Sequence, residues 1–249
     1  MDVNRGAKVY AFLAHVTIGG VALETVFLDA GGVLVFPNWT RVSEALAKQR
    51  VSVAPEALAA AEPHAKRQLD TGETVRGTND TSRGWLYFNL VLTAAGVPLN
   101  EATDAALADL HEYHRQQNLW ELLPPQVVPA LAALKRARLR LVVVSNANGT
   151  LCAKFDRLGL TPHFDCVLDS CEWGVEKPDP RLFRIALEKS GASPETTIHV
   201  GDLYHVDVLG ARAAGIRGVL LDEAGLYPEA DCPRFRSLEE LVAGIRDFD

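Results

Sequence analysis

Polar side chains that could act together follow several apolar runs of this sequence. Asp29 follows the run Thr25–Leu28, Ser145 and Asn146 end a run of valines, and Asp202 stands five residues before Asp207. Carboxylates that gather without a cation repel one another. Their oxygens are hard ligands of the kind that Mg²⁺ prefers. The residue types therefore indicate a carboxylate site that binds a divalent cation.

A lysine joins this set after the remaining apolar run. Glu172, Glu176 and Lys177 follow residues 164–168. Taken singly, each polar residue has an ordinary explanation, because aspartates cap helices and polar residues occupy turns. In a parallel sheet, however, all of these strand ends meet at one edge. The ordered set therefore favours a site over a series of caps and turns.

Strands and helices alternate along the second half of the chain, and this pattern positions the polar residues. Alternation of this kind predicts βαβ units and a doubly wound, mostly parallel α/β sheet. The strands expected are 25–29, 139–145, 164–168, 196–200 and 219–222, and the helices are 127–138, 151–158, 181–190, 206–214 and 238–247.

A segment of different composition separates the first strand from the rest. Residues 38–49 have helical spacing, and residues 53–120 have apolar side chains three and four apart with turn signals between them, which predicts about four more helices. We therefore expect an α/β core (23–36 and 125–249), an inserted helical cap (37–124) and an N-terminal extension (1–22). The connections near 35–37 and 124–125 would act as hinges.

Composition excludes several classes of partner. The formal net charge is -7 and no basic block stands out, so nucleic-acid binding has no electrostatic support. Residues 9–23 are apolar but too short to span a bilayer, and we expect an extra edge strand there rather than a membrane contact. The four cysteines form no CxxC pair, which favours a reduced, cytoplasmic protein. The expected partner is a small molecule, and the sequence leaves monomer and homodimer open.

Four sequence motifs, taken in order, resemble those of the haloacid dehalogenase (HAD) superfamily of aspartate-nucleophile hydrolases. They are Val26-Phe27-Leu28-Asp29-Ala30-Gly31-Gly32-Val33-Leu34, Val142-Val143-Val144-Ser145-Asn146, Lys177-Pro178-Asp179-Pro180, and His199-Val200-Gly201-Asp202 with Asp207 and the stretch 210–215. The insert after the first motif is similar to the helical cap of one subfamily.

This resemblance implies a mechanism and a cofactor. Asp29 would attack the phosphorus of a small phosphorylated metabolite and form an aspartyl-phosphate. Ser145, Asn146 and Lys177 would bind the phosphoryl group. Mg²⁺ would be held by Asp29, Asp202, Asp207 and the backbone carbonyl of Gly31.

One position departs from the family pattern. Phosphatases of the family carry a second aspartate two residues after the nucleophile, and here that residue is Gly31. Such acid-base catalysis is typically worth ~10²–10⁴-fold. The glycine leaves open a 2-haloacid dehalogenase, which needs no proton donor, and a protein that binds phosphate or a metabolite without turnover. Phosphonatases instead use a cap lysine, for which Lys48 and Lys66 are the available residues.

No residue of the insert stands out as a replacement for the missing aspartate. Its candidates for proton transfer, anion binding or lining the cleft are His64, His111, His114, Arg67, Arg115, Trp85 and Tyr87. A solvated helix face explains the charged ones, and packing inside the cap explains the aromatic ones. His205 lies inside the fourth motif, where a role near the metal or substrate and a surface helix position are equally open.

Overall fold

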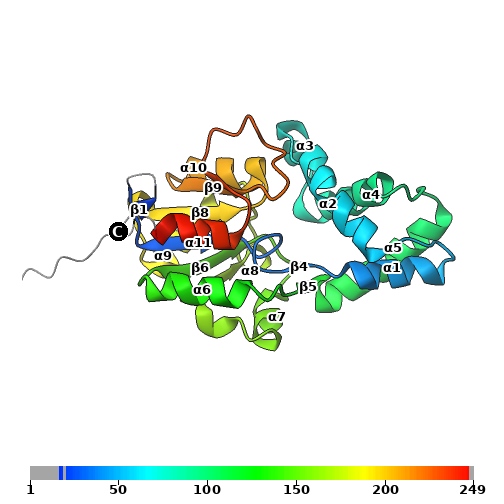
Figure 1. Cartoon of the computed structure of the whole chain (residues 1–249), viewed down its shortest axis with the longest axis horizontal. Coiled ribbons are helices and arrows are strands. Elements are labelled where there is room, and N and C mark those ends of the chain that lie inside the picture. The colour runs from blue at the N-terminus through cyan, green and yellow to red at the C-terminus, as the bar shows by residue number, and fades with distance from the viewer. Residues whose placement is uncertain (1–16, 19–20, 247–249) are drawn as a thin grey trace, which may run out of the picture.

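The chain forms an α/β lobe and a helical lobe, joined by two adjacent strands (Figure 1). The structure is a computed structural model, and it describes residues 17–18 and 21–246. In this described part, a six-stranded parallel sheet in the order β10-β9-β8-β3-β6-β7 forms the centre of the α/β lobe. The strands are β3 (Thr25–Leu28), β6 (Arg140–Ser145), β7 (Cys166–Asp169), β8 (Thr197–Gly201), β9 (Arg217–Leu221) and β10 (Arg234–Phe235).

Helices cover both faces of this sheet. One face packs against α6 (Val127–Arg136), α7 (Leu151–Arg157) and α11 (Leu238–Arg246), and the other packs against α9 (Pro180–Ser190) and α10 (Leu209–Ala213). Short helical segments complete the lobe: η1 (Thr161–His163), α8 (Ser170–Trp173), η2 (Pro194–Thr196) and the π-helical turn η3 (Tyr204–Val208).

Because helices cover both faces of the sheet, β3 consists of a run of apolar residues. Val26 and Leu28 point into the first face's core and Phe27 points into the other. Strands buried on both faces need apolar residues at every position instead of alternating ones. The run therefore places β3 in the middle of the sheet.

The order of the strands creates a crevice above β3. The chain passes from β3 to its neighbour β6 and the edge strand β7, and then returns to β8 on the other side of β3. Open α/β sheets bind ligands at such a reversal, outside the carboxyl ends of the strands. The ends of β3, β6 and β8 all meet there.

The helical lobe has a hydrophobic core of its own. It comprises α1 (Trp39–Lys48), α2 (Pro55–Leu69), α3 (Gly72–Gly77), α4 (Asp80–Ala94) and α5 (Glu101–Gln117). Asparagines begin three of these helices, because Asn38, Asn79 and Asn100 accept hydrogen bonds from backbone N–H groups of the first turn. Buried residues of α1, α2, α4 and α5 pack together, separately from the sheet's cores.

The two connections between the lobes are paired. β4 (Phe36–Pro37) and β5 (Trp120–Leu122) form a short antiparallel ribbon. Both crossings of the chain therefore lie side by side. The first coincides with the expected connection at residues 35–37, and the second comes just before the one expected at 124–125.

The sequence-based fold class is confirmed, and several local elements differ from their predictions. The strands β1 (Thr17–Ile18) and β2 (Val21–Ala22) pair with each other and not with the main sheet, so the expected edge strand is wrong for these residues. Residues 1–16 lie outside the described residues. The helix expected from residue 206 begins as the turn η3, and β10 adds an edge strand that the sequence did not predict.

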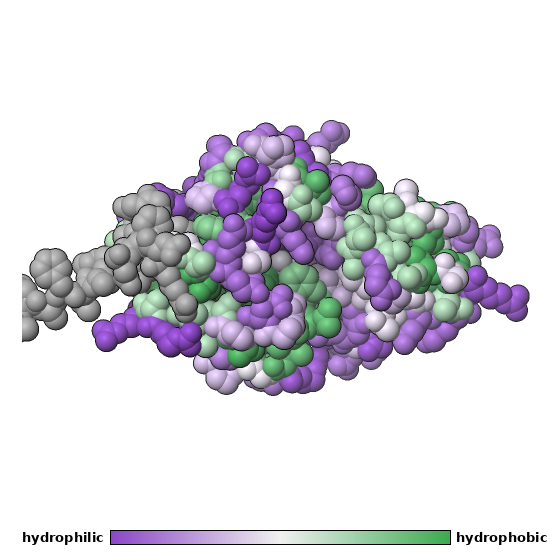
Figure 2. Space-filling view, in the orientation of Figure 1, coloured by the Kyte–Doolittle hydropathy of each residue, from purple (hydrophilic) through white to green (hydrophobic). Residues whose placement is uncertain are grey.

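The face seen in Figure 2 carries hydrophilic residues over both lobes, with smaller hydrophobic areas between them. Within residues 17–18 and 21–246, none of the helices combines the length and the apolar character needed to cross a bilayer.

Replacing Phe27 with alanine tests the double cover of β3. Phe27 is fully buried, so the Phe27→Ala variant should lose about 3–5 kcal/mol of unfolding free energy. Urea denaturation followed by circular dichroism measures the loss. Leu99 is 48% exposed, and Leu99→Ala serves as the control, with an expected change within about 0.5 kcal/mol. Equal losses in both variants would contradict this placement of β3.

Candidate active site

Strand register brings the predicted residues to one edge. Leu28 lies opposite Val143 of β6 and Val200 of β8. Asp29 is therefore level with the next residue of each neighbour, and Ser145 and Asp202 stand one position further along. A hydrogen bond from the backbone N–H of Ala30 to Asp29 Oδ1, 2.7 Å long, orients the carboxylate.

Lys177 lies between two of the aspartates. Its ammonium nitrogen is 2.9 Å from Asp29 Oδ1 and 2.6 Å from Asp207 Oδ1, and its side chain is 1% exposed. Asn146 fixes the lysine backbone from both sides: its amide donates to the Lys177 carbonyl (3.0 Å) and its Oδ1 accepts from the Lys177 N–H (2.7 Å). In this structure Asn146 therefore positions Lys177.

Asp29, Asp202 and Asp207 each place a carboxylate oxygen within 4.8 Å of the others. Two glycines make this approach possible. A Cβ atom at Gly32 would lie 2.0 Å from Asp202 Oδ2, and one at Gly201 would lie 2.1 Å from Asp207 Cγ. Any other residue at either position would push a carboxylate out of the cluster.

The crowding changes the acidity of these groups in opposite directions. Burial, with repulsion from Asp207 and Asp29, raises the pKa of Asp202 to about 6, although Lys66 acts in the lowering direction. Burial also acts to raise the pKa of Asp207, but Lys177 and His199 outweigh it and lower that pKa below its ordinary value. Burial acts to lower the pKa of Lys177, and its two carboxylate partners raise it above the ordinary value.

The donor set fits a magnesium ion. Hard carboxylate oxygens converge, and a glycine at residue 32 lets Asp202 lie close to the backbone that follows Asp29. Asp29, Asp202 and Asp207 would hold the ion, with the backbone carbonyl of Gly31 as the fourth protein ligand that the family resemblance implies.

Ser145 ends β6 and is 3% exposed. Its hydroxyl donates to the Asn146 carbonyl over 3.3 Å, a weak bond that a phosphoryl oxygen could replace. The register places this hydroxyl at the same edge as Asp29.

A tryptophan occupies the space beside Gly31. A Cβ atom at Gly31 would lie 3.2 Å from Cδ1 and 3.3 Å from Nε1 of Trp120. The indole also packs against the rings of Tyr87, Phe88 and His114. The position of the usual acid-base carboxylate is therefore bordered by a packed aromatic ring.

The histidines considered as replacements for the missing acid-base aspartate make other contacts or are exposed. His64 is exposed, and the His111 ring packs at a tilt against Trp85, with ring centroids 4.7 Å apart. His114 Nδ1 accepts the Leu119 N–H, and burial lowers the pKa of His114 to about 4, so the ring is neutral near pH 7. His205 Nδ1 lies 3.3 Å from Asp70 Oδ1.

The arginines, Tyr87 and the two lysines considered in the sequence analysis also have other contacts or are exposed. Arg115 pairs with Glu112 at the surface, and Arg67 binds the Leu226 carbonyl and Glu229 of the α/β lobe. Tyr87 is buried in the helical core. Lys48 is exposed, whereas Lys66 reaches Asp202 with an N–O distance of 2.8 Å.

Sequence reasoning missed some residues of this site. His199 is buried in β8 and its Nε2 lies 2.9 Å from Asp207 Oδ1, and its place in an otherwise apolar strand is a signal that could have been used. Asp70 accepts backbone N–H groups of Tyr204 and His205, and the sequence gives no signal of that contact.

Comparison with known proteins gives the family of this chain. The family model described as haloacid dehalogenase-like hydrolase matches residues 23–215, and the chain belongs to this family. Among curated proteins, it is 38% identical over 151 residues to mouse haloacid dehalogenase-like hydrolase domain-containing protein 3, covering 59% of each chain. It is 41% identical over 143 residues to a phosphoserine phosphatase from Thermus thermophilus, covering 57% of this chain and 55% of that protein.

The chain thus matches somewhat more than half the length of these curated relatives. A solved structure of a magnesium-bound HAD hydrolase from Bacillus subtilis is similar with a TM-score of 0.63 and 18% identity, covering 90% of this chain and 99% of that one. At this identity the similarity concerns the fold.

Removing the Lys177 ammonium should destabilise the protein strongly. In the Lys177→Met variant, Asp29 and Asp207 lose their shared cation inside the protein, which should cost about 3–5 kcal/mol of unfolding free energy. Urea denaturation without divalent cations measures the loss. Lys135→Met is the matched control, because Lys135 pairs with Asp165 at the surface, where such pairs contribute about 0–1 kcal/mol. Similar losses in both variants would argue against a buried cluster.

The lowered pKa of His114 predicts a pH dependence of stability. The unfolded histidine binds a proton near its ordinary pKa of 6.5, and the folded one only near about 4. The unfolded state therefore gains protons first, and stability falls as the pH decreases from 6.5 to 4. His114→Asn should reduce this slope by up to about 1.4 kcal/mol per pH unit, measured by urea denaturation at several pH values. His64→Asn is the control, and an unchanged slope in His114→Asn would refute the prediction.

Proposed function

We propose that this protein is a magnesium-dependent phosphatase of small phosphorylated metabolites. The observation that carries the proposal is the placement of Asp29 beside Lys177 and within the carboxylate cluster of Asp202 and Asp207. A nucleophile, a buried cation and hard oxygen ligands in one crevice are what an anionic phosphoryl group requires.

In the proposed reaction, the Asp29 carboxylate attacks phosphorus. The new oxygen–phosphorus bond forms as the bond to the leaving alkoxide breaks, which gives an aspartyl-phosphate on Asp29. Lys177 and Ser145 hold phosphoryl oxygens, and Asn146 keeps Lys177 in place. Bound Mg²⁺ would supply positive charge against the charge that develops on the phosphoryl group. Water then hydrolyses the aspartyl-phosphate and regenerates Asp29.

Gly31 limits which substrates react quickly. It has no side chain to protonate the leaving oxygen, and Trp120 borders its position. An alkoxide leaving group therefore departs with less assistance than in a phosphatase that has the second aspartate. Esters with acidic leaving groups would be the favoured substrates.

We further propose that the helical lobe, with boundaries near residues 37–124, works as a lid over this crevice. The paired strands β4 and β5 are the place where a rigid lobe with its own core could rotate. Such closure would exclude bulk water from the aspartyl-phosphate. The identity to a phosphoserine phosphatase supports a small phosphorylated substrate.

Two other activities of the same nucleophile fit less well. Displacing halide from a 2-haloacid needs no proton donor, in keeping with Gly31, but it gives no use to the cation-binding carboxylates Asp202 and Asp207. An imine mechanism through Lys66 needs a neutral amine. The pKa of Lys66 is raised by Asp202 and Glu62 in spite of burial, so the amine is protonated.

The rates of hydrolysis of an aryl and an alkyl phosphate test the proposed phosphatase activity. With Mg²⁺, the wild type should hydrolyse p-nitrophenyl phosphate, and Asp29→Asn should fall to the uncatalysed rate, because it lacks the nucleophile. The wild type should hydrolyse an alkyl phosphate such as glycerol phosphate at least about 100-fold more slowly, because that leaving group needs a proton. Release of phosphate is the measurement.

The controls identify the alternatives. EDTA should abolish phosphate release. Wild-type rates equal to those of Asp29→Asn would refute the phosphatase. Chloride released from 2-chloropropionate in the presence of EDTA would support a dehalogenase. Phosphate binding by calorimetry, without hydrolysis of any ester, would support a binding protein.

A further inference from the structure

Lys66 connects the helical lobe to a residue of the carboxylate cluster. It lies on α2, its ammonium nitrogen is 2.8 Å from Asp202 Oδ2 and 2.9 Å from Glu62 Oε1, and its side chain is 19% exposed. Glu62 is one helical turn away on α2, and its other oxygen accepts a bond from the Trp39 indole (3.2 Å). One ammonium is thus shared by an acid of its own lobe and an acid of the α/β lobe.

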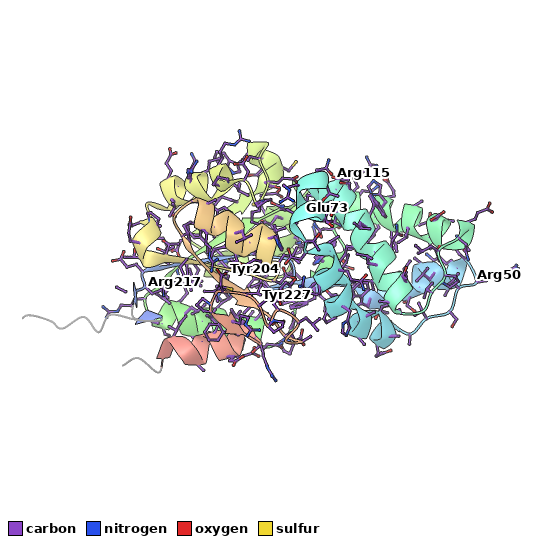
Figure 3. All side chains as sticks on the ribbon, turned by 90° about the horizontal axis from the view of Figure 1, so that it is seen from above. Arg50, Glu73, Arg115, Tyr204, Arg217 and Tyr227 are labelled. Atoms are coloured by element: carbon purple, nitrogen blue, oxygen red, sulfur yellow. The ribbon has the colours of Figure 1, made fainter. Side chains whose placement is uncertain are left out.

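The same face of α2 makes further contacts with the α/β lobe. One turn after Lys66, Asp70 accepts the backbone N–H groups of Tyr204 and His205, at the start of the helical stretch that follows Asp202. The Arg67 guanidinium lies 5.0 Å from the centre of the Tyr227 ring. Figure 3 shows Tyr204 and Tyr227 on the α/β lobe near its boundary with the helical lobe. The bond between Lys66 and Asp202 therefore belongs to the contact that holds the two lobes together.

Lys66 and a bound metal ion would both place positive charge beside Asp202. Asp29, Asp202 and Asp207 carry three negative charges, and Lys177 and Lys66 supply two positive ones near them. A divalent ion held by Asp202 would bind the carboxylate that Lys66 already contacts through Oδ2. Two cations at one carboxylate repel each other, so each weakens the binding of the other.

The ion pair with Glu62 lowers the free-energy cost of separating Lys66 from Asp202. If α2 moves away from Asp202, the ammonium keeps its bond to Glu62 inside the same helix. The helical lobe then carries away a paired lysine, and the α/β lobe is left with a carboxylate ready for the metal. No unpaired buried charge is created on either side.

We propose that Lys66 is a tethered cation that competes with the divalent metal for Asp202, so that metal binding releases α2 from the α/β lobe. The inference rests on the metal site of the proposed function. It makes the position of the helical lobe depend on metal binding before any substrate arrives.

Calorimetric titration with MgCl₂ tests the competition. Lys66→Gln removes the competing charge and keeps a long polar side chain. If Lys66 occupies Asp202 in at least about nine of ten molecules, the variant should bind Mg²⁺ about tenfold more tightly than the wild type. Lys66→Arg, which restores the charge, should return the affinity to within about threefold of wild type. Lys48→Gln, the loss of an exposed lysine on α1, should leave it unchanged.

Hydrogen exchange measures the release of α2. The amide hydrogens of Tyr204 and His205 bond to Asp70 in the closed arrangement. In the wild type, Mg²⁺ should accelerate their exchange about tenfold or more, because Asp70 leaves with α2. In Lys66→Gln, exchange should be fast without Mg²⁺. A metal that only ordered the neighbouring Asp202 and Asp207 would slow these amides, which is the opposite sign.

The outcomes separate this inference from the proposed function. Equal or weaker Mg²⁺ binding in Lys66→Gln, with far-ultraviolet circular dichroism like that of wild type, would overturn the competition and leave the phosphatase intact. Slower exchange at Tyr204 and His205 with Mg²⁺ would overturn the release. If calorimetry detects no Mg²⁺ binding in the wild type or in Lys66→Gln, the metal site is refuted, and both proposals fail with it.

Discussion

Mutual repulsion among Asp29, Asp202 and Asp207 is the constraint on which this structure depends. Three carboxylates whose oxygens lie within 4.8 Å of one another are unfavourable unless cations balance them. The fold supplies one permanently, since Lys177 is buried between two of them and held by its backbone through Asn146. The central position of β3, with β6 and β8 on either side, is what brings these residues together.

The division into two lobes follows from where the apolar residues are buried. The sheet's faces and the helices α1 to α5 bury separate sets of side chains, so each lobe is stabilised largely by its own interior. The contact between the lobes is polar by comparison. It includes Lys66 with Asp202, Asp70 with two backbone amides, and Glu176 with the N–H of Asp80 at the start of α4. Contacts with water or ions can replace polar contacts of this kind, as the proposed movement of the helical lobe would require.

The sequence predicted those features that depend on local patterns. The apolar run Thr25–Leu28 marked β3, and the polar residues after successive strands marked the site, because parallel strands must end at a common edge. Residues brought in by the helical lobe could not be predicted in this way. Lys66 and Lys48 look alike in the sequence, and only the docking of α2 separates them, because helical periodicity does not identify a partner across a boundary between lobes. The catalytic roles at the site stay predictions.

The packing of Trp120 beside Gly31 has a consequence for how this chain can change over evolutionary time. A Cβ atom at residue 31 would be 3.2 Å from the indole, so an aspartate there requires Trp120 to move by a few tenths of an ångström. Shrinking Trp120 first would leave a void among Tyr87, Phe88 and His114. Substitutions at residues 31 and 120 should therefore be coupled, because both change the packing of the same indole.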